Sequence, residues 1–268
     1  MKKYIFYRIT SKLNQKSRVE NFSKLNCLES LINGFPDYKI ICVADNCDHH
    51  ILKTLEEKNF FKLIKTKLGN AASFNYLINF ELPQLNDDDL IYFAEDDYLY
   101  RTNAYQVLEE GLKYFDYVTL YDHPDKYGNH PLDRNLLIPN GVLSEFTQII
   151  KGSRALWRTT NSTTMTFGCY AKTMKKDYKI WNMMTKKFNV PRDFYIWILL
   201  TCPQKNFFTS YLNLSIILII SNLLFIFRGK RLLGVSTPSY AAHLELGMTP
   251  DNFYNDFIEP KNNEEKLF

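Results

Sequence analysis

Residues 90–97 read Leu-Ile-Tyr-Phe-Ala-Glu-Asp-Asp, a short apolar run that ends in three consecutive carboxylates. A run of this length, bounded by acids, is typical of a buried strand at the centre of an α/β sheet. Three adjacent carboxylates repel one another unless a positive charge lies among them. A hard divalent cation such as Mg²⁺ or Mn²⁺ takes oxygen ligands and commonly bridges to substrate phosphates. Glu95, Asp96 and Asp97 are therefore interpreted as a metal and phosphate site, whereas the acidic residues 87–89 are interpreted as a solvated turn.

Short apolar runs alternate with amphipathic segments through the first half of the chain. Strands are expected at residues 4–9, 38–43, 61–64, 90–94 and 117–121. Helices are expected between them, at residues 22–32, 50–57, 71–80 and 104–115. This alternation implies βαβ units, and hence an α/β fold with a central, mainly parallel sheet flanked by helices. Ligands bind such sheets beyond the carboxyl ends of the strands, where residues 95–97 fall.

The second half of the chain is less regular. Residues 122–158 are expected to form loops, because Pro and Gly recur among them. The expected elements after them are strands at residues 163–170 and 232–235 and helices at residues 174–187 and 193–200. Neither an internal repeat nor a clear linker divides the sequence, so a single domain over residues 1–268 is expected.

Composition narrows the functional classes. The chain has 268 residues, 46% of them apolar, which is enough for a buried core. The net charge of +4 is mild and its basic residues interleave with acids, so no nucleic-acid partner is expected. The five cysteines are odd in number and form no Cys-x-x-Cys pair, which argues against a disulfide framework and a thiolate zinc site. With no secretory signal recognised at the N-terminus, a cytoplasmic location is expected.

One apolar segment stands apart from this soluble composition. Residues 211–227 read YLNLSIILIISNLLFIF, and Arg-Gly-Lys-Arg follows. Seventeen residues lie at the lower limit for a membrane span. A buried helix or hairpin, a membrane-surface element through residues 211–231 and a true span therefore all stay open.

Several short motifs occur in a fixed order along the chain. They are Val-Ala-Asp-Asn-Cys-Asp at 43–48, Gly-Asn-Ala-Ala-Ser-Phe-Asn at 69–75, Phe-Ala-Glu-Asp-Asp at 93–97 and Pro-Ser-Tyr-Ala-Ala-His at 238–243. This series resembles the glycosyltransferases of the GT-A fold, especially those of family 2. Looser matches lie at residues 120–126, 157–158, 163–167 and 190–193. The resemblance covers nearly the whole chain except residues 203–228.

The resemblance implies a GT-A-like fold and a metal-dependent glycosyltransferase. Residues 1–121 would bind a nucleotide-diphosphate sugar. Residues 122–268, with the apolar insertion at 203–228, would bind a glycan, lipid-linked or protein acceptor. The sequence departs from the family pattern at Glu95, where Asp is usual, and at Arg192, where a second acid is usual.

The same match assigns roles to individual residues on the donor side. The residues matched to the donor nucleotide, its ribose and its diphosphate are Asp45, Asn75, Glu95 and Asp96. Asp97 and His243 are matched to the ligands of Mn²⁺ or Mg²⁺. Other interpretations stay open for three of them: Asp45 as a turn residue, Asn75 as a residue of a helix surface and His243 as a packed core residue.

Transfer of a sugar also needs a general base, because the acceptor hydroxyl loses a proton as it attacks the anomeric carbon. Asp193 is the candidate, since residues 190–193 resemble the family segment that carries an acid near the acceptor. A base on the acceptor side predicts inversion at that carbon. An Asp that opens an apolar helix is also a common N-cap, so the two interpretations stay open.

Four further residues are candidates for the acceptor side. Asp122 and His123 follow an expected strand, and a turn role is the alternative for both. Trp157 is predicted to stack on a sugar and Arg158 to pair with a phosphate. Ordinary packing and a surface cation are the alternatives for these two residues.

Two other functional classes compete with the transferase. A nucleotidyltransferase also uses carboxylates, metal and a nucleotide, but it usually has a Gly-rich basic loop near the first strand, and residues 8–18 contain no Gly. A catalytically inactive sugar- or membrane-binding protein is the second alternative, against which the retained acids and His243 argue.

Overall fold

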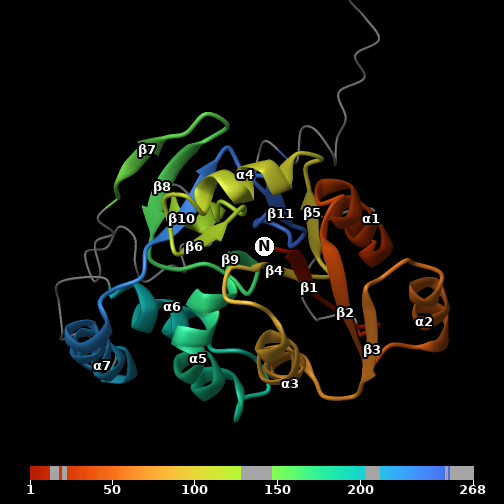
Figure 1. Cartoon of the computed structure of the whole chain (residues 1–268), viewed down its shortest axis with the longest axis horizontal. Helices are drawn as coiled ribbons and strands as arrows, with labels where there is room; N and C mark the ends of the chain where they lie inside the picture. Colours follow the sequence, from red (N-terminus) through yellow and green to blue (C-terminus); the bar gives the residue numbers. More distant parts are fainter. Residues whose placement is uncertain (13–17, 20–22, 128–146, 203–211, 251–252, 254–268) are drawn as a thin grey trace, which may run out of the picture.

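The computed structural model describes residues 1–12, 18–19, 23–127, 147–202, 212–250 and 253. Within these residues nine strands form one mixed sheet in the order β3-β2-β1-β4-β9-β6-β10-β8-β7, and helices cover both of its faces (Figure 1). The predicted α/β fold class is confirmed. A separate two-stranded sheet pairs β5 with β11.

The first half forms the predicted parallel part of the sheet. Its strands are β1 (Lys3–Ile9), β2 (Lys39–Asp45), β3 (Lys62–Thr66) and β4 (Leu90–Glu95). Its helices are α1 (Lys24–Gly34), α2 (His49–Glu56), α3 (Asn70–Tyr76), which π-helical and 3₁₀ turns extend to Gln84, and α4 (Ala104–Gly111).

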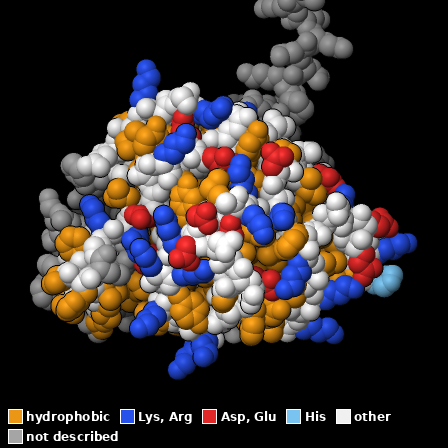
Figure 2. Space-filling model, viewed as in Figure 1, with side chains coloured by type: hydrophobic (Ala, Val, Ile, Leu, Met, Phe, Trp, Pro, Cys, Tyr) orange, Lys and Arg blue, Asp and Glu red, His pale blue; other side chains and the backbone are white. Residues whose placement is uncertain are grey.

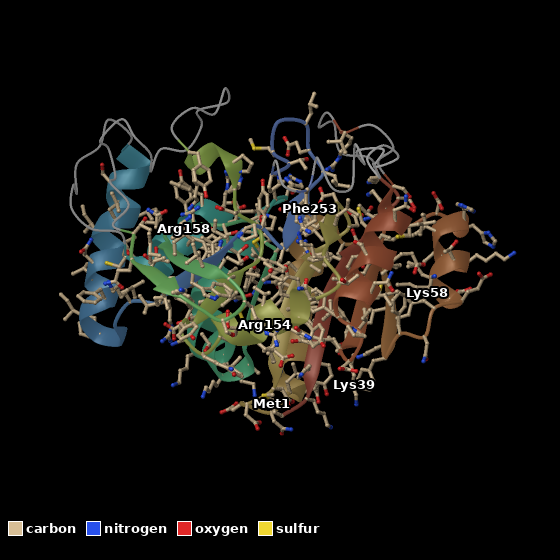
Figure 3. The ribbon with its side chains drawn as sticks, turned by 90° about the horizontal axis from the view of Figure 1, so that it is seen from above. Met1, Lys39, Lys58, Arg154, Arg158 and Phe253 are labelled. Atoms are coloured by element: carbon tan, nitrogen blue, oxygen red, sulfur yellow. The ribbon has the colours of Figure 1, made fainter. Side chains whose placement is uncertain are left out.

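Strand β1 lies between β2 and β4, so the carboxyl ends of these three strands form one edge. Met1 and Lys39, at the starts of β1 and β2, lie on one side of the molecule, and Phe253 lies toward the other (Figure 3). The register pairs Arg8 with Glu95 across this edge.

The second half interleaves with the first in the same sheet. Strand β6 (Tyr117–Thr119) lies between β9 (Phe167–Tyr170), to which it is antiparallel, and β10 (Leu233–Thr237), to which it is parallel. The two predicted halves therefore share one sheet, as a single domain requires. The prediction that residues 122–158 form only loops is wrong, because they include β7 (Ile149–Lys151) and the start of β8 (Leu156–Thr160), an antiparallel hairpin at the sheet edge.

Two hydrophobic cores lie on opposite faces of the sheet. One contains residues of α1 and α4. The other contains residues of α3, α5 (Ala171–Thr185) and α6 (Asp193–Thr201). In this second core the Trp181 ring stacks on Phe167, with centroids 4.8 Å apart, and meets Trp197 edge-on. These contacts hold α6 against α5 and the sheet.

The apolar segment forms helix α7 (Leu212–Arg228), which packs against α6 at one side of the molecule (Figure 1). The beginning of the predicted insertion, residues 203–211, lies outside the described residues. Among the helices that the structure describes, none combines the length and the apolar character needed to cross a membrane.

Glu110 on α4 holds the connection between β7 and β8. Its carboxylate accepts hydrogen bonds from the backbone N–H groups of Ser153 and Arg154, from the Ser153 hydroxyl and from Trp157 Nε1. Burial raises its pKa, but these hydrogen bonds from Ser153, Trp157 and Arg154 outweigh burial and lower the pKa to about 2.

We predict that Glu110→Gln lowers the free energy of unfolding at neutral pH by about 1–3 kcal/mol, because an ionised acceptor of several hydrogen bonds is lost. Since the folded-state pKa is depressed, the stabilisation is complete above the unfolded value of about 4.3. It is lost as the pH falls toward the folded value. Urea unfolding across pH should therefore show a constant difference near neutrality that shrinks below about pH 4. A difference independent of pH would contradict this, and Glu56→Gln, at a half-exposed ion pair, is the control.

Candidate functional site

Each carboxylate at the end of β4 pairs with a different basic side chain. Glu95 Oε1 lies 2.7 Å from Arg8 Nη2, and Asp96 Oδ2 lies 2.7 Å from Lys24 Nζ. Asp97 Oδ2 lies 2.9 Å from Arg18 Nη1. These pairs offset the mutual repulsion of the three carboxylates and the desolvation of Asp96 and Asp97, which are buried, whereas Glu95 is half-buried.

Arg8 connects β4 to the start of α3. It belongs to β1, and its side chain is buried beside that of Glu95. Its Nη1 donates to both the carbonyl and the side-chain oxygen of Asn70, each at 2.7 Å. A planar guanidinium with several donors suits this bridging position.

Lys24 and Asp96 fix the segment that follows β1. Lys24 Nζ donates to the carbonyl oxygens of Thr10 and Lys12, and the Thr10 N–H donates to Asp96 Oδ2 at 2.9 Å. Burial and the neighbouring charge of Asp97 raise the pKa of Asp96, while Lys24 opposes that rise.

Asp97 and His243 form the centre of the site. His243 Nε2 lies 3.1 Å from Asp97 Oδ2, and the Leu244 N–H donates to the Asp97 carbonyl. Strand β11 (Ala241–His243) pairs with β5 (Tyr98–Tyr100), and the His243 ring stacks on Tyr98 with centroids 4.8 Å apart. Burial acts to raise the pKa of Asp97, but His243 and Arg18 outweigh it and hold that pKa below its usual range.

The donor atoms of Asp97 and His243 fit a hard divalent cation that takes its remaining ligands from substrate. Two neighbouring ligands in octahedral Mg²⁺ coordination lie roughly 3 Å apart, close to the separation of these two atoms. Within the described part of the chain no group of three or more His, Cys, Asp or Glu side chains could hold a metal ion. Phosphate oxygens and water would have to complete the coordination, and Arg18 would have to give up its place on Asp97.

A pocket of about 260 Å³ lies beside these carboxylates. Its lining includes Arg8, Asn70, Ser73, Asp45 and residues 95–97. Gly69 has a φ of 96°, which favours glycine, and a Cβ there would point into open space. Backbone at this point can therefore approach a ligand closely.

Asp45 lies in the pocket wall, but its carboxylate is already occupied. It accepts hydrogen bonds from the backbone N–H groups of Leu68 and Gly69 and from the Thr66 hydroxyl. Burial raises its pKa, yet these hydrogen bonds lower the pKa overall. The contact between Asp45 and a nucleotide stays a prediction.

Asn75 does not line the pocket. Its amide donates to Asn182 and Thr185 on α5 and accepts from Asn79, so it joins helices. Asn70, five residues earlier, occupies the pocket wall instead.

Asp193 is the first residue of α6, and the cap position belongs to Arg192. Its Oδ1 accepts the Phe194 N–H at 2.8 Å. Burial raises the pKa of Glu95, opposed by Arg8, and the negative charges of Asp97 and Asp193 add to the rise. Asp193 therefore lies within electrostatic range of Glu95.

Of the four predicted acceptor residues, Trp157 lies in the core, whereas Asp122, His123 and Arg158 do not point into it. Asp122 accepts hydrogen bonds from Arg158, Tyr127 and Thr237, and the His123 ring packs on Tyr121. Trp157 is fully buried and donates to Glu110, so the predicted stacking of a sugar on Trp157 is wrong. Its side chain points to the core, whereas that of its neighbour Arg158 points to the other face of β8, as alternation in a strand requires.

The basic residues of the site were not predicted from the sequence. Arg8, Arg18 and Lys24 lie in or near the first strand and helix, where single cations carry no pattern. The acidic run at residues 95–97 could have indicated that basic partners lie nearby, because buried acids need such partners, but it does not say which cations they are.

Comparisons with known proteins give a distant likeness of fold. No protein-family model matches the chain, and no curated protein matches it in sequence. Among solved structures, TarS 1–349 of S. aureus is 13% identical, with 90% of this chain and 60% of that chain covered and a TM-score of 0.45. A 4-diphosphocytidyl-2C-methyl-D-erythritol synthase from Anaerococcus prevotii is 14% identical, with 89% and 91% covered and a TM-score of 0.42.

The galactosyltransferase LgtC is 10% identical, with 89% and 86% covered and a TM-score of 0.40. Similarity to glycosyltransferases, which the motifs predicted, is thus found among solved structures. The identities and TM-scores are too low to assign this chain to a family, and its function has to be inferred from its own residues.

We predict that Lys24→Met lowers the free energy of unfolding by about 3–5 kcal/mol, because Asp96 is left buried without its cation. The double variant Lys24→Met/Asp96→Asn should recover part of this loss. Lys65→Met, at a pair exposed on both sides, should cost about 0–1 kcal/mol. Urea unfolding measures all three, and equal losses for Lys24→Met and Lys65→Met would contradict the buried pair.

Proposed function

We propose that this chain is a glycosyltransferase that moves a sugar from a nucleotide-diphosphate donor to a glycan, lipid or protein acceptor, with Mn²⁺ or Mg²⁺ as cofactor. The observation that carries the proposal is the set of ion-paired carboxylates around the pocket at the carboxyl ends of β1, β2 and β4. Alternating charges of this kind suit a ligand that is itself a diphosphate with a divalent cation.

The donor side uses residues of the first half. Arg8 and Asn70 line the pocket and would donate to a diphosphate, and the open backbone at Gly69 would allow it to approach. The region of Asp45 would receive the nucleoside, with Glu95 and Asp96 beside the ribose and diphosphate. Asp97 and His243 would hold the cation, which would neutralise negative charge on the leaving nucleotide diphosphate.

The acceptor side uses residues of the second half. Asp193 would take the proton of an acceptor hydroxyl as its oxygen bonds to the anomeric carbon. The bond from that carbon to the phosphate oxygen breaks at the same time, and its electron pair stays on the nucleotide diphosphate. Attack opposite the leaving group inverts the anomeric configuration. Asp122, His123 and Arg158 are the proposed acceptor contacts, and the five free cysteines fit a reducing cytoplasm.

A nucleotidyltransferase is the second candidate. The observation in its favour is the set of basic side chains around the pocket: Lys12 lines it, and Arg18 and Lys24 pair with Asp97 and Asp96 in its wall. The two candidates differ in product. Nucleotidyl transfer releases pyrophosphate from a nucleoside triphosphate, whereas sugar transfer releases a nucleoside diphosphate.

We predict that purified protein releases nucleoside diphosphate from one of a panel of UDP-, GDP- and dTDP-sugars when Mn²⁺ is present, and that EDTA abolishes the release. Asp97→Ala should lower the rate by about 10²-fold or more, because charge stabilisation of the leaving group is lost. Asp88→Ala, at an exposed acid of the turn before β4 and thus at the opposite end of that strand, should leave the rate unchanged. Pyrophosphate from a triphosphate, without diphosphate release from any sugar nucleotide, would favour the second candidate.

We predict a different signature for Asp193→Asn. Loss of a general base should lower the rate of transfer by about 10²–10⁴-fold and leave the affinity for the donor unchanged. Calorimetric titration with the donor nucleotide and Mn²⁺ checks the affinity. Urea unfolding checks the stability of the variant, because Asp193 is the first residue of α6. The substitution should lower the free energy of unfolding by less than about 1 kcal/mol. Weaker nucleotide binding with an unchanged rate would contradict the role of base.

A further inference from the structure

Helix α7 buries two serine side chains and Leu218, and leaves seven large apolar side chains exposed. Ser221 is fully buried and donates to the Ile198 carbonyl at 2.7 Å, and Ser215 is also buried. Ile226 and Phe227 are 73% and 86% exposed. A helix on a water-facing surface normally presents the opposite arrangement, with its apolar stripe toward the core.

The exposed apolar face of α7 is continuous along the described helix. Its members are Ile216, Ile219, Ile220, Leu223, Phe225, Ile226 and Phe227. Figure 2 shows hydrophobic side chains gathered over α7 at the lower left of the molecule. Single exposed apolar residues are common, but a contiguous set marks a contact surface.

The connection between α5 and α6 extends this face. A cavity of about 350 Å³ joins the two elements and is lined by Met184, Phe188, Arg192, Tyr195, Ile216 and Ile217. Phe188 and Val190 of the connection are themselves exposed. The apolar surface therefore runs from α7 to the start of α6.

The charge around this face is almost entirely positive. Residues 186–230, which include the connection and α7, contain six Lys and Arg and one acid, Asp193. The exposed cations beside the apolar side chains include Lys186, Lys187, Arg192 and Lys230. A second copy of the chain would bring like charges together, whereas an anionic lipid surface complements them.

We propose that α7 and the connection between α5 and α6 form a peripheral binding face for an anionic lipid bilayer. The apolar side chains enter the boundary between headgroups and acyl chains, and the surrounding cations pair with lipid phosphates. The helix lies in the plane of the surface, since its serine side is packed on α6. This inference rests on the face alone and holds whatever reaction the pocket carries out.

Co-sedimentation of the full chain with vesicles tests the proposal. We expect binding to phosphatidylcholine vesicles that contain about 30% phosphatidylglycerol and little binding to phosphatidylcholine alone. The double variant Ile226→Glu/Phe227→Glu should weaken binding about tenfold or more, because charges replace inserted apolar groups. Lys186→Glu/Lys187→Glu should weaken binding to the anionic vesicles more than about fivefold.

A matched control separates this face from general surface hydrophobicity. Ile149 on β7 is 73% exposed, the same fraction as Ile226, so Ile149→Glu should bind vesicles like the wild type. Circular dichroism verifies that each variant is folded. Absence of wild-type binding, or equal losses for Ile149→Glu and the α7 variant, would overturn the proposal. Light scattering that shows a dimer dissociated by the α7 substitutions, without vesicle binding, would assign the face to a second copy instead.

Discussion

The pairing of three adjacent carboxylates, the buried Asp96 and Asp97 and the half-buried Glu95, with three basic side chains is the constraint on which the rest of the site depends. A carboxylate withdrawn from water is costly unless a cation and hydrogen bonds compensate for it. The three partners come from different parts of the chain: Arg8 from β1, Lys24 from α1 and Arg18 from the segment between them. Burial of the β4 terminus therefore also positions the start of α1 and the start of α3.

The same ion pairs shift the pKa values of the three carboxyl groups in different directions. Burial raises the pKa of Glu95 and Asp96, whereas His243 and Arg18 hold the pKa of Asp97 low despite burial. Negative charge is thus most firmly held at Asp97, the residue next to the imidazole of His243. Under the proposed function the cation binds at Asp97, because a hard cation favours an ionised oxygen ligand, and it would take the place of Arg18 there.

The sequence predicted the parallel half of the sheet well, because buried parallel strands are continuous apolar runs with acids or turns at their ends. It missed β5, β7 and β11, which have three residues each, and β8, which pairs with β7 at the sheet edge. The acids of the site stood out as a run, whereas Arg8 and Lys24 are single cations in ordinary segments. Asn75 and Trp157 were misplaced because one sequence does not reveal which face of an element a side chain occupies.

Helix α6 links the pocket to the apolar surface. Asp193 at its first residue lies in electrostatic range of Glu95, and α7 packs along its length through Ile198 and Leu218. The ring contacts of Trp197 with Trp181 and Phe167 hold α6 against the sheet. Because packed cores move little, these contacts fix the distance between the proposed base and the proposed lipid-binding face. A face that binds a bilayer would keep the proposed base near acceptors carried in that bilayer, so the two proposals together favour a lipid-linked acceptor.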